Sequence, residues 1–195
     1  MSKKYSKTTA DYLSWDQNLN LIRKLYNDGD YKMSLLISIG SFWGLRISDI
    51  LRLKWQDILE RDGFVLIEKK TQKRREIKIN SQLRQHIIEC YQQIKPMSVD
   101  KEIFISQKGS VYSIQRLNVI FKSIKSRYNL KIENYSTHSM RKTFGRQVFT
   151  QSGTNAELSL MKLRELFNHS SVIVTRRYLG ITRDELLQTY DVLHF

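Results

Sequence analysis

The sequence has little cysteine, proline or glycine, and it has no long apolar run. Among 195 residues there are one Cys, one Pro and 8 Gly. The single cysteine, Cys90, excludes an intramolecular disulfide and a cysteine-based metal cluster. The scarcity of proline and glycine argues against a long disordered linker. No segment approaches the roughly 18 apolar residues of a membrane span, and residues 1–12 lack the apolar core of a signal peptide. We therefore expect a soluble, cytoplasmic protein with no membrane partner.

Positive charge is what the chain has in excess. Its 33 Lys and Arg residues outnumber 19 Asp and Glu residues, which gives a formal net charge of +14. Such an excess repels itself unless a polyanion is near, and nucleic acid is the commonest polyanion; a membrane surface or an acidic protein are the alternatives. The basic residues are dispersed along the whole chain. This dispersion favours a folded surface that binds a phosphate backbone over a basic tail.

Capping signals and apolar periodicity predict a mostly helical chain. Ser14 and Gln17 have the spacing of a capping box, and Gly29–Asp30 should end the helix that follows. A buried helix should end near Gly44, and another should begin at a cap on Ser48. Further helices are predicted at residues 81–94, 113–128, 137–153, 155–169 and 172–180, and at 182–193 after a capping box of Thr182 and Glu185.

One region breaks the helical pattern. Residues 63–79 have apolar, β-branched runs on both sides of a basic centre, which predicts a β-hairpin, and a short strand is expected at residues 103–106. With 41% hydrophobic residues the chain has enough material for a packed core. We expect one domain over residues 1–195, of class α+β but mostly α, with a small antiparallel sheet near residues 63–79.

Four places carry groups that could bind phosphate or transfer protons. Arg46 lies in an apolar stretch, where burial of its guanidinium needs an anionic partner; the structural alternative is a pair with Asp49. His138 and Arg141 lie one helical turn apart and can reach one target together, although a solvated basic helix has the same spacing.

The other two places are the hairpin centre and a stretch near the C-terminus. The hairpin centre is strongly basic, although any soluble hairpin tip can be so; its residues are Lys69, Lys70, Lys73, Arg74 and Arg75. His169 and Tyr178 follow, nine residues apart, and alone this spacing means nothing because both residues are common in cores.

Together these groups suit transesterification of a phosphodiester without a metal. Arginine forks fit the non-bridging oxygens and stabilise charge on the pentacoordinate phosphorus. A histidine or lysine can handle protons at the entering and leaving oxygens, and a tyrosine can attack and hold a covalent intermediate. No paired-carboxylate cluster that would hold two Mg²⁺ ions stands out in the sequence. We expect neither a metal nor a cofactor.

Three segments and the hairpin resemble the conserved boxes of the tyrosine recombinases of the phage-integrase type. The segments are "GLRISDILRL", "HSMRKTFG" and "NHSSVIVTRRYL", and "EKKTQKRREIKI" resembles the K-T-x-K-x-R form of the hairpin that carries the family's lysine. They occur in the family's order and at its spacings, over about residues 12 to 190. The resemblance implies an integrase-type catalytic domain that cuts and rejoins double-stranded DNA, as a monomer when free and as a homo-tetramer on paired DNA sites.

The resemblance also implies a role for each residue. Arg46, His138, Arg141 and His169 would surround the scissile phosphate, with Asp49 supporting Arg46. Lys70 would be the general acid for the 5′-hydroxyl leaving group, and Lys73 is the alternative because the register of the turn is not settled by sequence. Tyr178 would form the 3′-phosphotyrosyl link. The residues expected to contact DNA are Lys69, Lys73, Arg74, Arg75 and Lys142.

Two departures from the family pattern stand out. Asn168 replaces the glycine that usually precedes the last histidine, and Asn tolerates a left-handed backbone better than most residues. The core-binding domain that many relatives place before the catalytic domain is not found in this chain. Two other functions remain open at this point: a type IB topoisomerase-like swivelase, and a non-catalytic DNA-binding regulator that retains the fold.

Overall fold

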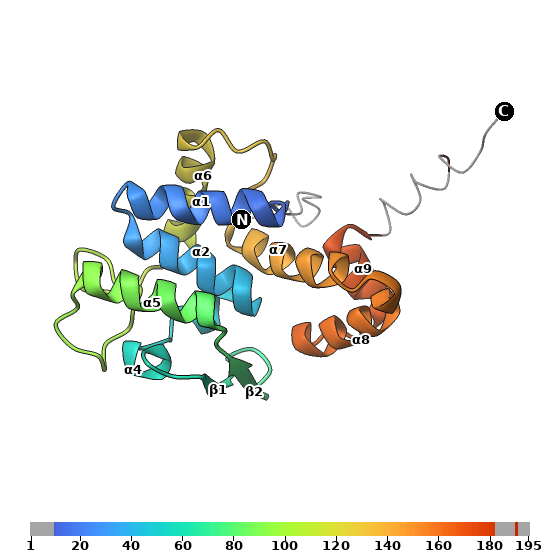
Figure 1. Cartoon of the computed structure of the whole chain (residues 1–195), viewed down its shortest axis with the longest axis horizontal. Coiled ribbons are helices and arrows are strands. Elements are labelled where there is room, and N and C mark those ends of the chain that lie inside the picture. Colours follow the sequence, from blue (N-terminus) through green and yellow to red (C-terminus); the bar gives the residue numbers. More distant parts are fainter. Residues whose placement is uncertain (1–9, 182–189, 191–195) are drawn as a thin grey trace. The chain divides into compact units, whose positions relative to one another are not determined.

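The computed structural model describes residues 10–181 and residue 190 (Figure 1). The chain divides into two compact units, and the boundary between Phe144 and Gly145 falls within a helix, α7 (Thr137–Thr150). The helix predicted from Thr182 lies outside the described residues. No described helix is long and apolar enough to span a membrane.

The first unit is built around a buried helix. The elements before α7 are α1 (Trp15–Asn27), α2 (Tyr31–Trp43), α3 (Ile47–Ile50), α4 (Trp55–Ile58), β1 (Gly63–Ile67), β2 (Arg74–Lys78), α5 (Ser81–Ile94) and α6 (Ile114–Arg127). The central helix is α2, which is apolar on every side and packs against both α1 and α5 (Figure 1). Its burial places its C-terminal end, where the candidate site begins, inside the unit.

Local caps set the ends of these helices. Ser14 and Gln17 form a capping box at the start of α1, with both reciprocal hydrogen bonds present. Asn80 and Ser113 accept hydrogen bonds from the first turns of α5 and α6. Gly44 ends α2 in the left-handed conformation, with φ of 58°. The capping box at Ser14 and the stop at Gly44 confirm the sequence predictions, because both ends follow from local hydrogen bonding.

The close approach of α7 to α2 explains two glycines. A Cβ on Gly40 would overlap the Met140 side chain, and a Cβ on Gly44 would overlap the Phe144 ring. The α7 backbone can therefore lie against α2 only where α2 has no side chain in the way. This contact brings the first half of α7 to the C-terminal end of α2.

The predicted hairpin forms, and β1 and β2 pair as an antiparallel two-stranded sheet with Gly63 opposite Lys78 and Ile67 opposite Arg74. Leu66 and Ile77 face the core, while Val65 and Ile67 face outward. The fold class predicted from the sequence, α+β with mostly helix and a small sheet, is therefore confirmed.

Two local predictions are wrong. The cap of α3 is Arg46, and Ser48 lies inside that short helix, because the turn after Gly44 starts the helix two residues earlier. Residues 103–106 form no strand; Ile105 makes only an isolated bridge with Val111. An apolar run there is explained by burial of Ile103 and Phe104 in the core.

The second unit contains the end of α7, a 3₁₀ turn (Gly153–Asn155), α8 (Ala156–Phe167) and α9 (Val172–Leu179). α8 packs against α9. Gly145 allows the end of α7 to meet both helices, because a Cβ there would lie 2.5 Å from Leu179 Cδ2 and 3.1 Å from Phe167. Asn168 ends α8 in the left-handed conformation with φ of 51°, as expected for the residue that replaces glycine.

Candidate active site

Arg46 lies at the turn between α2 and α3. The left-handed Gly44 reverses the chain direction, and Arg46 then takes the cap position of α3 with extended backbone angles. Its Nη1 donates a hydrogen bond to Glu68 Oε2 at 2.7 Å. The Arg46 side chain keeps 19% of its surface exposed, whereas that of Glu68 keeps 3%. The predicted need of Arg46 for an anionic partner is therefore met by Glu68, from the hairpin.

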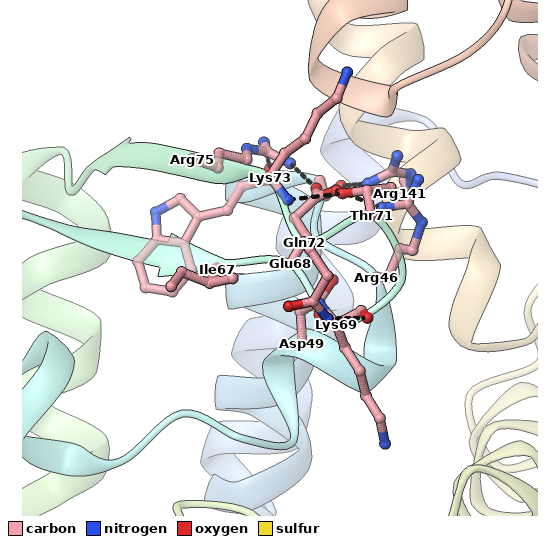
Figure 2. Close-up of polar contacts among 12 residues, drawn as sticks. Arg46, Asp49, Ile67, Glu68, Lys69, Thr71, Gln72, Lys73, Arg75 and Arg141 are labelled. Carbon is pink, nitrogen blue, oxygen red and sulfur yellow. Dashed lines mark hydrogen bonds and ion pairs between the residues drawn. The ribbon is translucent and has the colours of Figure 1, made fainter.

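Glu68 follows directly after β1 and is surrounded by donors. Figure 2 shows its carboxylate among its neighbours, which are Arg46, Thr71, Arg75 and Arg141. Thr71 Oγ1 donates to Oε2 at 2.8 Å, and Arg75 Nη1 lies 3.7 Å from Oε1. Burial alone would raise the pKa of Glu68, but the hydrogen bonds from Thr71 and Arg46 and the charges of Arg46 and Arg141 outweigh it, so the pKa lies below the usual value. Glu68 is therefore an anion at neutral pH.

The C-terminal end of α2 holds two further arginines. Arg75 Nη2 donates to the Trp43 carbonyl oxygen at 2.6 Å, and Arg141 Nη1 donates to the Gly44 carbonyl oxygen at 2.5 Å. The last carbonyls of a helix lack intrahelical partners and carry partial negative charge, which suits cations. β2 and α7 are thereby attached to the same helix end.

Asp49 supports the site by holding the hairpin turn. It is fully buried on α3, and its Oδ1 accepts a hydrogen bond from the Lys69 backbone N–H at 2.8 Å. Its Oδ2 is buried without a hydrogen-bond partner in the part of the chain that the structure describes. The hairpin turn is thus attached to α3 through its backbone as well as to Arg46 through Glu68.

The hairpin turn carries the two lysines between which the sequence did not choose. The Glu68 N–H donates to the Lys73 carbonyl at 3.0 Å, the Gln72 N–H donates to the Glu68 carbonyl at 2.9 Å, and Gln72 is left-handed with φ of 56°. Lys70 lies within this turn and Lys73 follows it; both are exposed. The choice between them as general acid stays a prediction.

His138 and Arg141 lie on the first half of α7, one turn apart as predicted. The pKa of His138 is lowered by partial shielding from solvent and by the positive charges of Arg141, Lys142 and Arg46. The His138 ring is therefore neutral at pH 7, in a form that can accept a proton. Arg141 follows His138 by one turn of α7, and the positive charges of Arg46 and Arg141 both act on its ring.

The second unit brings His169 and Tyr178 together. Their ring centroids are 5.2 Å apart with an interplanar angle of 70°, and Phe167 contacts both rings edge to face. Asn168 ends α8 and thereby turns the chain so that His169 Nδ1 lies 3.0 Å from Thr175 Oγ1 on α9. The nine-residue spacing in sequence thus places the two side chains side by side on neighbouring elements.

The residues predicted to contact DNA differ in exposure. Lys69, Lys73 and Arg74 are exposed. Arg75 has only 11% of its side-chain surface exposed, and Lys142 is buried with 8% of its surface exposed. Contact of these residues with DNA stays a prediction. The inward direction of Arg75 shows that the basic hairpin carries two kinds of arginine, one at the surface and one that binds Glu68 and α2.

Cys90 is buried and is not a nucleophile at neutral pH. Burial, with a contribution from Glu89, raises the pKa of Cys90 to about 12, so its thiol is protonated at neutral pH. Among residues 10–181 and 190, no group of three or more His, Cys, Asp or Glu residues could hold a metal ion.

Glu68 is the residue that the sequence analysis missed. A signal was present, because Leu66 and Glu68 are two residues apart and a strand directs alternate residues to the same face. Leu66 is buried at 9% exposure and Glu68 at 3%. An acid on the buried face of a basic hairpin needs cations around it, and Arg46 and Arg75 are those cations.

The chain is similar in sequence to a known protein family. The model of the phage integrase family matches residues 13–185. The Probable integrase/recombinase YoeC of Bacillus subtilis (strain 168) is 32% identical over 168 residues, which cover 85% of this chain and 85% of that protein. Tyrosine recombinase XerD of Staphylococcus aureus (strain N315) is 22% identical over 199 residues, which cover 99% of this chain and 65% of that protein.

Solved structures show the same fold. The crystal structure of the XerA recombinase matches with a TM-score of 0.70 and 17% identity, over 100% of this chain and 68% of that one. The post-cleavage complex of the XerH site-specific recombinase with a palindromic difH substrate also matches with a TM-score of 0.70, at 20% identity, over 97% of this chain and 55% of that one. This chain therefore spans little more than half of XerH and about two thirds of XerD.

Proposed function

Because the chain belongs to the phage integrase family, we propose that it is a site-specific DNA recombinase that cuts and rejoins DNA strands through a 3′-phosphotyrosyl intermediate. The observation that carries this proposal is that the positive charges of Arg46 and Arg141, in the first unit, both act on His138 and on Glu68. Relatives at this level of similarity are named integrases and tyrosine recombinases, and the net charge of +14 suits a double-stranded DNA partner.

In the proposed cleavage step, the Tyr178 hydroxyl oxygen attacks the scissile phosphorus. A bond forms between that oxygen and phosphorus, the bond from phosphorus to the 5′-oxygen breaks, and Lys70 gives its proton to the leaving oxygen. The tyrosine proton passes to a neutral base, and His138, whose lowered pKa leaves it uncharged at pH 7, suits that role. Arg46, Arg141 and His169 stabilise the charge that develops on the non-bridging oxygens.

Rejoining reverses the same chemistry. A 5′-hydroxyl of another strand attacks the phosphotyrosyl phosphorus, and the tyrosine leaves with a proton. Each step exchanges one phosphoester bond for another, so no ATP and no bound metal are needed for the energy balance. The assembly that this requires, a tetramer on paired DNA sites formed from monomers that repel one another when free, is also part of the proposal.

The test uses covalent capture of DNA. Purified protein is incubated with a pool of short duplexes that have a random central sequence and a nick, so that cleavage releases a short fragment and the adduct cannot be reversed. We expect a denaturation-resistant protein–DNA band for the wild type, no such band for Tyr178→Phe, and undiminished non-covalent binding for that variant because phosphate contacts dominate affinity.

A matched variant, Tyr190→Phe, removes the hydroxyl of an exposed tyrosine in the same part of the chain and should still form the adduct. Absence of an adduct with the wild-type protein would leave a non-catalytic DNA-binding protein. Adducts accompanied by relaxation of supercoiled DNA, with no exchange between paired sites, would indicate a swivelase and contradict the proposed recombination.

A further inference from the structure

Glu68 has no part in the chemistry described above, yet it lies among Arg46, Arg75 and Arg141, which we call the arginine group. Its carboxylate is buried, accepts hydrogen bonds from Arg46 at 2.7 Å and Thr71 at 2.8 Å, and lies 3.7 Å from Arg75. A buried carboxylate is costly unless it is paired and hydrogen-bonded, and here each oxygen has a cation beside it. A carboxylate held in this way restricts the movement of the side chains that bind to it.

The first group that Glu68 restricts is the Arg46 guanidinium. Its N–H donors lie in one plane, so a short charge-assisted hydrogen bond at Nη1 sets the orientation of the whole fork. The Arg46 side chain still reaches solvent with 19% of its surface, whereas Glu68 is enclosed at 3%. Glu68 thus holds the buried side of the fork and leaves part of the guanidinium accessible to a phosphate.

The second group is the hairpin turn that carries Lys70. The Glu68 backbone closes the turn through its N–H to Lys73 and its carbonyl to Gln72. Its side chain accepts from Thr71, the residue next to Lys70. One residue therefore connects Arg46, at the start of α3, to the turn with the proposed general acid.

We propose that Glu68 is a positioning residue for DNA cleavage, which acts through Arg46 and the hairpin turn and does not itself contact DNA. This proposal rests on the proposed function. Loss of the Glu68 charge removes the ion pair with Arg46 and weakens the hydrogen bond from Thr71. The guanidinium and the turn should then be held less firmly, so the rate of adduct formation at saturating DNA should fall more than the affinity for DNA. A residue with a purely structural role would change stability and leave that rate, measured on folded protein, unchanged.

The experiment compares Glu68→Gln with Glu76→Gln. Glutamine keeps the size and one acceptor oxygen of Glu68 but removes the charge. Glu76 is an exposed residue of β2, opposite Val65, so its substitution removes the same charge from the same hairpin outside the arginine group. Single-turnover adduct formation, DNA affinity and thermal unfolding are measured for both. We expect Glu68→Gln to slow the adduct step by roughly 10- to 100-fold, the equivalent of a lost hydrogen bond to a charged group, and Glu76→Gln to change it less than about twofold.

A double-mutant cycle with Arg46→Lys tests whether the effect passes through Arg46. Lysine keeps the charge but cannot form the planar fork. If Glu68 acts by orienting that fork, Glu68→Gln should lower the rate of adduct formation by less than about threefold in the Arg46→Lys background. Equal losses in both backgrounds would overturn the proposal. If Glu68→Gln does not fold, Thr71→Val is the second variant to test. It removes one hydrogen bond to Glu68 without leaving an unpaired charge, and we expect it to lower the rate of adduct formation by a smaller factor.

The outcomes separate this proposal from the proposed function. If the wild type forms no adduct, the proposed function fails, and the role of Glu68 fails with it. If the wild type forms the adduct and Glu68→Gln matches Glu76→Gln in rate, the function stands and only the positioning role of Glu68 is refuted. A slower adduct step with retained DNA affinity and a rate coupled to Arg46 supports both.

Discussion

Arg141 donates a hydrogen bond from Nη1 to the backbone carbonyl oxygen of Gly44, 2.5 Å away. Gly44 ends α2 in the left-handed conformation, and a Cβ there would overlap the Phe144 ring of α7. The same glycine thus ends one helix, lets a second helix pack against it, and presents the carbonyl that holds the second arginine of the site. A predicted turn signal therefore also determines where Arg141 lies.

Gly44→Ala should destabilise the protein by about 2–4 kcal/mol, because the left-handed backbone costs roughly 1–2 kcal/mol without glycine and the added methyl overlaps Phe144. Urea unfolding measures this. Gly29→Ala is the control, since Gly29 also has positive φ but a Cβ there meets nothing within 4 Å. We expect the control to lose only about 1 kcal/mol. Equal losses would show that the contact with Phe144 contributes nothing.

Neighbouring arginines of the hairpin should respond differently to substitution. Arg75→Gln removes the hydrogen bond to Trp43 and the ion pair with Glu68, so it should lower the free energy of unfolding by about 2 kcal/mol. Arg74 is exposed, and Arg74→Gln should change stability by less than about 0.5 kcal/mol.

Arg74→Gln, which should hardly change stability, should have its effect on the affinity for DNA. If Arg74 contacts a phosphate, its substitution should weaken binding and reduce the slope of log affinity against log salt by about 0.9. A salt series of equilibrium binding measurements gives this slope. An unchanged slope for Arg74→Gln would remove Arg74 from the DNA-contacting residues.

The lowered pKa of His138 predicts the acid side of the pH–rate profile. A histidine has an ordinary pKa of about 6.5, and shielding together with Arg141, Lys142 and Arg46 brings the folded value below it. The neutral ring therefore persists as the pH falls through 6.5, and a rate that depends on it declines only at lower pH. Adduct formation should keep most of its rate at pH 6.5.

The same pKa shift sets the sign of an effect on stability. As the pH falls, the unfolded chain takes up a proton on His138 before the folded chain does. The contribution of His138 to the free energy of unfolding is therefore full above the ordinary pKa, and it is lost as the pH falls towards the lower folded pKa. His138→Gln should make the acid loss of stability less steep. Unfolding measured between pH 7 and pH 5 tests this, and a steeper loss in the variant would contradict the direction of the shift.

Lys70→Ala should slow cleavage of an ordinary phosphodiester. A substrate with a 5′-bridging phosphorothiolate should restore the rate, because a thiolate leaves without needing a proton. Lys73→Ala is the matched variant, since both lysines are exposed at the same turn. Rescue of Lys73→Ala, without rescue of Lys70→Ala, would assign the general acid to Lys73.

Deletion of residues 182–195 tests the proposed assembly on DNA. The sequence of this segment, with a capping box and apolar Leu186, Leu187, Val192 and Leu193, predicts an amphipathic helix, and exchange of this helix between subunits would couple assembly to the placement of Tyr178. We expect single-site binding to persist in native gels and higher-order complexes to disappear. Assembly as efficient as that of the full chain would show that the segment packs only on its own subunit.

Sequence alone predicted the features whose causes are local. Ser14 with Gln17 and the left-handed Gly44 act on backbone groups within a few residues of themselves, so their effect depends little on the rest of the chain. The hairpin was visible because a change from helical to alternating periodicity needs no distant partner. The order and spacing of the three conserved boxes then predicted the family, which the family match confirms.

Tertiary structure alone decided which acid pairs with which arginine. Asp49, three residues after Arg46, was the near candidate, but Glu68 carries the ion pair and Asp49 holds the backbone of Lys69. The partners of Arg75 were equally hidden, because they come from α2 and from the end of β1. The strength of a charge pair depends on distance in space and on burial, and neither quantity can be read from separation along the chain.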